Sequence, residues 1–190
     1  MPKYSQSNIR FIIRPGEFKA LYQKAYPLEN KIWVLILWLT GGRPEEVIRL
    51  KKQDILLEED KVKIRLETLK KPKNEEFRVT KRNLCTAGEN LRPYLESLQK
   101  HINRLQRENL FSFSKRTGYN IISRLGMSVL GFPLCPYNFR HSRLTLLAEK
   151  GATNDELKRF KGSSTDKSIK PYIHARNVEY TVETTISENL

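Results

Sequence analysis

The pattern of apolar and polar residues predicts two helices near the start of the chain. Pro15 and Gly16 open the first helix, and Pro27 ends it. The second helix spans Glu29–Leu39 and is apolar on nearly all sides, so we expect it at the centre of the core. Its longest apolar run, Ile32–Leu39, is far shorter than the roughly 20 residues that a membrane span requires.

The pattern then changes from helical spacing to alternation. Ile55–Leu57 and Val62–Leu66 read as strands, and Glu76–Val79 reads as a returning strand after a turn at Lys70–Asn74. Together they predict a small three-stranded antiparallel sheet. The hairpin tip carries three lysines, Lys70, Lys71 and Lys73. A charged, solvated turn is the simplest interpretation of this tip.

Helical spacing returns in the second half of the chain. Four more helices are expected, over Gly88–Leu110, Tyr119–Val129, Phe139–Lys150 and the residues from Thr153 to Lys161. Thr153 and Glu156 form a capping box at the start of the last one, and Gly162 ends it. A final short helix carries Tyr172. The fold class is therefore mainly α (α+β), a helical domain with one small antiparallel sheet.

Composition adds a strong positive charge to this picture. The chain holds 35 Lys and Arg against 21 Asp and Glu, which gives a formal net charge of +14 and a pI of about 9.8. Such an excess favours a polyanion as partner, and nucleic acid is the first candidate. A solubilising surface or a basic RNA binder is the alternative. Residues 177–190 contain three glutamates and no Lys or Arg, so this tail is expected to pack on protein rather than on DNA.

Cysteine usage and the first residues indicate an intracellular protein. Cys85 and Cys135 lie far apart without metal-ligand spacing, so we interpret both as free thiols in a reducing compartment. Residues 1–14 are polar and basic and lack the apolar core of a signal peptide. We expect the protein in the cytoplasm or nucleoid of its host cell, away from membranes.

Two arginines stand where they could bind a phosphate. Arg43 follows two glycines and precedes Pro44, which suits the first position of a helix, and a helix N-terminus favours an anion. Arg140 stands next to His141. A guanidinium is planar, always charged and bidentate, so two of them suit a phosphodiester, and a tyrosine such as Tyr172 suits a nucleophile. An arginine that merely pairs with a nearby glutamate explains Arg43 equally well.

Taken together, these segments resemble the motifs of the tyrosine recombinases, the phage integrase family. Thr40–Glu46 resembles the TGxRxxE box, Tyr137–His141 resembles the HxLRH box, and Gly162-Ser163 stands at the place of the LGH box. The nucleophile position then falls on Tyr172, nine residues after Ser163.

The resemblance covers about residues 15–176 and implies a domain organisation. A catalytic domain is expected over residues 14–176, between an N-terminal arm at 1–13 and an acidic tail at 177–190. The separate N-terminal core-binding domain that such proteins usually carry is not expected here.

The resemblance also implies roles for single residues. Arg43 and Arg140 would hold the scissile phosphate. Tyr172 would attack the phosphorus and form a 3′-phosphotyrosine link, and Lys71 would protonate the leaving 5′ oxygen. Glu46 would orient neighbouring residues on its helix without contacting the phosphate itself.

Further residues receive weaker assignments. Lys70 and Lys73 are the other candidates for the catalytic lysine, and with Arg143 they are expected to contact DNA. His141 and His174 lie close to the site in sequence and are candidates for proton transfer. A packing role on its helix is the alternative for His141.

Two positions depart from the family pattern. Tyr137 replaces the first histidine of the HxLRH box, and Ser163 replaces the residue after the glycine of the LGH box. Tyr137 could still hydrogen-bond a phosphate oxygen, and Ser163 could donate one bond. Neither carries protons near neutral pH, because the pKa of tyrosine is near 10.

The implied activity is site-specific DNA recombination or integration, in a mobile element such as a virus or plasmid. The phosphotyrosine link conserves the bond energy, so neither a metal nor another cofactor is expected. The implied partners are double-stranded DNA and further copies of the chain, as a tetramer on DNA. The tail could dock in trans on a neighbouring copy, or fold back in cis and cover the DNA site. A silent DNA-binding accessory protein and a topoisomerase-like nicking and closing enzyme remain alternatives.

Overall fold

The computed structural model describes residues 11–59, 61–70, 78–163 and 165–173. The chain divides into two compact units, Met1–Ser142 and Arg143–Leu190, with the boundary inside helix α7 (Pro136–Glu149). Within these described ranges, none of the helices combines the length and the apolar character that crossing a membrane would require.

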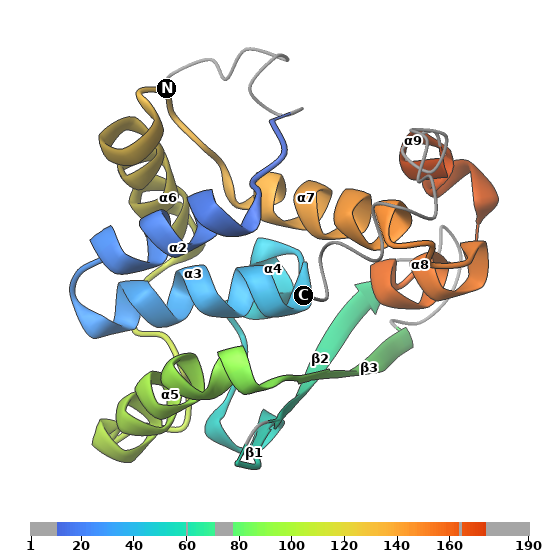
Figure 1. The fold of residues 1–190 in the computed structure, drawn as a ribbon. Helices are drawn as coiled ribbons and strands as arrows, with labels where there is room; N and C mark the ends of the chain where they lie inside the picture. Colours follow the sequence, from blue (N-terminus) through green and yellow to red (C-terminus); the bar gives the residue numbers. More distant parts are fainter. Residues whose placement is uncertain (1–10, 60, 71–77, 164, 174–190) are drawn as a thin grey trace. The chain divides into compact units, whose positions relative to one another are not determined.

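Helix α3 is the centre of the first unit. It spans Leu28–Thr40 and lies between α2 (Pro15–Lys24) and α5 (Arg92–Arg104), as Figure 1 shows. It also packs against α6 (Lys115–Leu130). Residues 32–40 are all buried, because apolar side chains cover every side of this helix. The prediction of a central buried helix is confirmed.

Aromatic side chains fill the contact between α2, α3 and α5. Phe18 stacks on Trp38 with ring centroids 4.6 Å apart, and it also contacts Tyr94 at 5.5 Å. Tyr22 meets Tyr94 edge to face at 4.8 Å. Stacked and edge-to-face pairs add to the energy of apolar burial. These ring contacts fix α3 in the core. The turn that follows α3 leads to Arg43.

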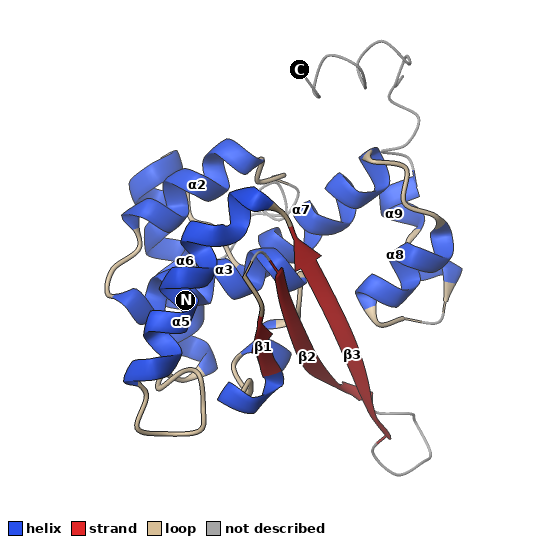
Figure 2. Ribbon diagram, turned by 60° about the horizontal axis from the view of Figure 1, so that its bottom comes forward, coloured by secondary structure: helices blue, strands red, loops and turns tan. Residues whose placement is uncertain are grey.

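The sheet is antiparallel and has the strand order β1-β2-β3 (Figure 2). β1 spans Ile55–Leu57, β2 spans Lys61–Lys70 and β3 spans Arg78–Ala87. Apolar residues at alternate positions of β2 are buried, namely Val62, Ile64 and Leu66. The mainly helical class with a small antiparallel sheet is confirmed.

The returning strand is longer than the pattern predicts. The alternation places it at Glu76–Val79, but β3 runs to Ala87, because it pairs with β2 along the whole length from Lys61 to Lys70. Most of the predicted turn lies outside the described residues, together with Lys71 and Lys73.

The long helix predicted over Gly88–Leu110 is wrong at both ends. A 3₁₀ turn precedes α5, and α5 stops at Arg104. The leucine spacing continues beyond that point, but the Leu110 N–H donates to the carbonyl of Leu50 at 2.8 Å instead of to its own helix. A long-range backbone bond therefore overrides the local helical pattern.

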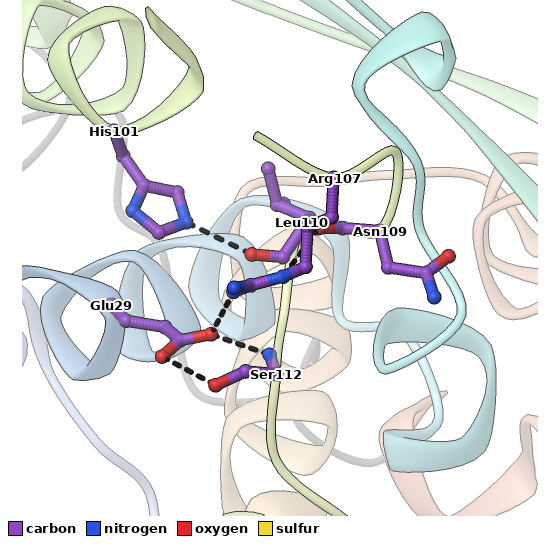
Figure 3. Close-up of polar contacts among 6 residues, drawn as sticks. All are labelled: Glu29, His101, Arg107, Asn109, Leu110 and Ser112. Carbon is purple, nitrogen blue, oxygen red and sulfur yellow. Dashed lines mark hydrogen bonds and ion pairs between the residues drawn. The ribbon is translucent and has the colours of Figure 1, made fainter. Parts of the chain in front are cut away.

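Side chains hold the same segment in its extended course (Figure 3). Glu29 of α3 accepts a hydrogen bond from the Arg107 guanidinium at 2.7 Å, and further bonds from the backbone and hydroxyl of Ser112. His101 of α5 donates to the Leu110 carbonyl at 2.9 Å. These bonds fix residues 105–112 against the first unit's core.

Helix α6 begins earlier than the predicted start at Tyr119. Ser114 caps it, since the Ser114 hydroxyl accepts a bond from the Thr117 N–H at 3.2 Å. The first helical residue is therefore Lys115, which brings a lysine to the N-terminal end of this helix.

The second unit contains the end of α7, then α8 (Asn154–Lys161), a 3₁₀ turn at Asp166–Ser168, and α9 (Lys170–Ile173). The predicted capping box is confirmed: the Thr153 hydroxyl accepts a bond from the Glu156 N–H at 3.3 Å. The last helix is split into the 3₁₀ turn and α9 rather than continuous.

Candidate active site

A tight turn after α3 leads to the first arginine. The Thr40 hydroxyl donates to the Ile36 carbonyl at 2.6 Å and accepts from the Gly42 N–H at 3.0 Å. Gly41 is left-handed, with φ of 52°. A Cβ on Gly42 would lie 2.7 Å from Cγ2 of Val47, so the turn has no room for a side chain there. Both glycines are needed for this course of the backbone.

Arg43 follows at the start of α4 (Pro44–Val47). The buried Glu46 accepts bonds from the Arg43 N–H at 2.9 Å and from its Nη1 at 2.6 Å. The Arg43 side chain is still 36% exposed. The pairing with a glutamate, left open by the sequence, is thus present, and the arginine keeps an accessible side. The helix is a single turn, so its dipole is weaker than that of a long helix.

Arg140 lies in α7, behind this turn. Its Nη1 donates to the Gly41 carbonyl at 2.7 Å, and the side chain is buried. The Ser142 hydroxyl donates to the Asn138 carbonyl at 2.7 Å and accepts from the Ile13 N–H at 2.8 Å, which anchors α7 to the N-terminal segment. Two arginines from distant parts of the sequence therefore meet at one turn.

Tyr137 lies in the first turn of α7 and is 38% exposed. Its pKa is raised, first by burial and then by the negative charge of Glu45. The cations of Arg43, Arg140 and Lys115 oppose this rise. The phenol therefore lies within electrostatic reach of both arginines. The structure brings together three predicted site residues of the first unit.

Close to Tyr137 lies an ion pair that the sequence pattern did not predict. Lys115 Nζ lies 2.9 Å from Oε1 of Glu45. Burial is the strongest single influence on the pKa of Glu45 and raises it, but the hydrogen bond and charge of Lys115, a backbone hydrogen bond and a bond from Tyr137 together outweigh burial, and the pKa is lowered. The hydrogen bond to Glu45 raises the pKa of Lys115. Burial, followed by the nearby phenol of Tyr137, raises the pKa of Tyr119. No local signal connects residues so far apart in the sequence.

Tyr172, the predicted nucleophile, lies in α9 of the second unit. Its side chain is only 9% exposed. It packs in an apolar cluster with Leu144, Ala148, Leu157 and Ile169. Ser163 follows the left-handed Gly162, and the Ser163 N–H donates to the Lys158 carbonyl at 3.0 Å. Aromatic burial of this kind holds the tyrosine ring in a defined orientation.

Most of the chain matches a known protein family. Residues 12–179 match the model of the phage integrase family. The chain belongs to the phage integrase family. The family resemblance of Thr40–Glu46 and Tyr137–His141 is thereby confirmed. No curated protein matches the chain.

Solved structures of recombinases share the fold of this integrase-family chain. XerA recombinase matches with a TM-score of 0.68 and 19% identity, over 91% of this chain and 62% of its own. XerH site-specific recombinase bound to difH substrate matches with a TM-score of 0.61 and 17% identity, over 93% and 52%. Tn1549 transposon integrase in complex with transposon right end DNA gives 0.62 and 15%, over 94% and 65%. The chain thus spans between about half and two thirds of the length of these proteins.

The remaining candidate residues of this family member lie in α7, at the end of β2 and outside the described residues. His141 and Arg143 of α7 are half-buried, and burial lowers the pKa of the Arg143 guanidinium. Lys70 is the last residue of β2. His174, like Lys71 and Lys73, lies outside the described residues. The roles of all six stay predictions.

The two cysteines lie in different parts of the first unit. Cys135 is a buried free thiol, as expected, and burial raises its pKa. Cys85 belongs to β3.

Proposed function

We propose that this chain performs site-specific DNA recombination by cutting and rejoining strands through a 3′-phosphotyrosine intermediate. The observation that carries the proposal is the meeting of two arginines at one turn. Arg140 Nη1 donates to the Gly41 carbonyl at 2.7 Å, and Arg43 follows two residues later. Membership of the phage integrase family supports the same reaction.

In the proposed reaction, Arg43 and Arg140 bind the non-bridging oxygens of the scissile phosphate. Their fixed positive charge stabilises the negative charge that builds on these oxygens in the transition state. The Tyr172 hydroxyl attacks the phosphorus, and the bond to the 5′ oxygen breaks. That oxygen takes a proton from Lys71. A free 5′ hydroxyl of another strand reverses the step and releases the enzyme.

Neighbouring side chains support the two arginines in this proposal. Glu46 fixes the backbone and guanidinium of Arg43 through its two hydrogen bonds. Tyr137, within electrostatic reach of both guanidinium groups, donates a hydrogen bond to a phosphate oxygen. Ser163 supplies one further bond where the family pattern has a histidine or tryptophan. The reaction uses neither a metal nor ATP.

The proposed partners are double-stranded DNA and other copies of the chain. The basic charge of +14 fits a polyanion. The XerH and Tn1549 integrase structures are of proteins bound to DNA. A tetramer on DNA, with the acidic tail docking in trans, follows from the family resemblance, and a mobile element of a virus or plasmid is the proposed setting.

A nicked DNA duplex tests the reaction, because cleavage near the nick releases a short strand and traps the covalent intermediate. We expect a slow protein–DNA band on a denaturing gel that forms without metal and disappears in Tyr172→Phe. Tyr26→Phe is the matched control, since Tyr26 is 86% exposed and lies outside the site. A band that persists in Tyr172→Phe contradicts the proposal.

A silent DNA-binding function is the second candidate. Tyr137 and Ser163 favour it, because neither replaces the proton transfer of a histidine at neutral pH. Intact DNA binding without any covalent band across pH would support this function. Relaxation of plasmid DNA without recombinant products would instead support a nicking and closing enzyme.

A further inference from the structure

Lys161 occupies an unusual place beside the predicted nucleophile. It is the last residue of α8 and directly precedes Gly162, where the LGH box of the family has leucine. Its Nζ lies 5.1 Å from the centroid of the Tyr172 ring, and it also donates a hydrogen bond to the Ser168 carbonyl. The lysine therefore joins the end of α8, the 3₁₀ turn and α9.

The ring itself is enclosed by apolar residues. Tyr172 packs against Leu144 and Ala148 of α7, Leu157 of α8 and Ile169. In such surroundings a charge a few ångströms away acts more strongly than it does in water. An ammonium over the face of an aromatic ring also attracts the ring directly, by a cation–π interaction.

Two other charged residues of this unit, Lys158 and Glu156, bond to neighbouring groups. Lys158 lies 2.8 Å from Asp155 and 3.0 Å from Asp166, and the Glu156 carboxylate accepts bonds from Thr153. The elements packed around the ring carry further ionisable residues, Arg143 and Glu149 on α7, Arg159 on α8, Lys167 on the 3₁₀ turn and Lys170 on α9. Lys161 is the residue whose ammonium lies over the Tyr172 ring, with its Nζ 5.1 Å from the ring centroid.

We infer that Lys161 is a positioning residue for Tyr172, holding the ring between α8 and α9 and stabilising the phenolate that forms during attack. This inference rests on the proposed function. The O–H bond of Tyr172 breaks and its proton passes to water, while the oxygen forms the bond to phosphorus and the 5′ oxygen leaves. A nearby positive charge favours the phenolate over the phenol. Lys161 supplies this charge in a chain whose LGH box lacks histidine.

The first test compares Lys161→Met with Lys161→Arg on the nicked duplex. We expect Lys161→Met to slow covalent adduct formation by about 10-fold to 100-fold and to move its pH midpoint upward by about one unit. DNA affinity should stay unchanged, and Lys161→Arg should recover most of the rate because it keeps the charge. Lys167→Met, which removes an exposed lysine of the 3₁₀ turn, is the matched control. An unchanged rate in Lys161→Met overturns the inference.

A second measurement does not depend on DNA cleavage. In protein labelled with ¹³C at the Cζ of tyrosine, the Tyr172 signal is assigned by its loss in Tyr172→Phe. We expect this signal to titrate at higher pH in Lys161→Met than in the wild type or in Lys161→Arg. Equal titration in all three proteins overturns the inference, even where adduct forms. If the wild type forms no adduct, the proposed function fails, and the titration alone still decides whether Lys161 acts on Tyr172.

Discussion

At the residue scale, a backbone carbonyl helps to orient Arg140. Its Nη1 donates to the Gly41 carbonyl at 2.7 Å, which directs the planar guanidinium along the turn before Arg43. A lysine would keep the charge but would lose the planar arrangement of donors. The substitution therefore separates charge from geometry.

We predict that Arg140→Lys lowers the rate of covalent adduct formation by about 100-fold or more, because an oriented donor to the transition state is lost. DNA affinity should change by only a few fold. The rate is measured on the nicked duplex, and Arg104→Lys at the exposed end of α5 is the control. A rate within a few fold of the wild type would show that charge alone suffices.

The ion pair of Glu45 and Lys115 gives a prediction for pH. Burial raises the pKa of Glu45, but the hydrogen bond and charge of Lys115, a backbone hydrogen bond and a bond from Tyr137 together lower it below its ordinary value of 4.5. A lowered folded pKa stabilises the protein above the unfolded value, and the contribution is lost as the pH falls through the folded value. The stabilisation is therefore complete near neutral pH.

Glu45→Gln should accordingly lower the midpoint of thermal unfolding by a few degrees at pH 7, and the difference from the wild type should shrink below pH 4.5. Thermal denaturation followed by circular dichroism measures this. Glu59→Gln, at an exposed carboxylate 3.9 Å from Arg92, should show little effect at any pH. A difference that stays constant from pH 3 to pH 7 would contradict the role of the charge.

At the element scale, α6 packs so closely on the following loop that one position has no space for a methyl group. A Cβ on Gly126 would lie 2.5 Å from the backbone N of Leu134 and 2.7 Å from the carbonyl of Phe132. Backbone atoms cannot move aside as a flexible side chain can. The loop leads into α7, so this contact also sets where α7 begins.

Gly126→Ala should destabilise the fold by about 1–3 kcal/mol, the usual cost of forcing extra volume into a packed site. Gly16→Ala is the matched control, since its Cβ would meet nothing within 4 Å and alanine favours a helix. Urea denaturation compares the two variants. Equal midpoints for both would contradict the close contact between α6 and the loop.

The sequence predicts an element well when the residues that fix its ends lie close together in the chain. Thr153 and Glu156 lie three residues apart and bond to each other, so α8 starts where the capping box indicates. The end of α5 could not be predicted, because Leu110 bonds to Leu50 and its leucine spacing still reads as helix. Where a distant residue determines the end of a helix, the local sequence does not predict that end.

The same distinction applies to the candidate site. Arg43, Arg140 and Tyr172 stand at motif positions of the family, so the resemblance makes them candidates for the site. Glu45 and Lys115 lie 70 positions apart, and the ion pair between them follows only from the folded structure. The ring contact of Lys161 likewise depends on how α9 folds back on α8.

At the scale of the whole molecule, charge dominates the expected behaviour on nucleic acid. A chain with a net charge of +14 displaces counterions from DNA, so binding should weaken steeply with salt. With about four phosphate contacts, affinity should fall about 100-fold between 50 and 200 mM salt. Fluorescence anisotropy with matched DNA and RNA duplexes measures this. Tighter binding to RNA would favour a basic RNA binder, and a flat salt dependence would contradict phosphate contacts.

The apolar packing of Tyr172 has a consequence for its reactivity towards small reagents. Its side chain is 9% exposed, whereas that of Tyr26 is 86% exposed. Tetranitromethane, which nitrates accessible phenols, should therefore modify Tyr26 early and Tyr172 late, as mass spectrometry of peptides would measure. Nitration of both at the same rate would contradict the packing. Faster nitration of Tyr172 in the presence of DNA would record its release from the apolar cluster.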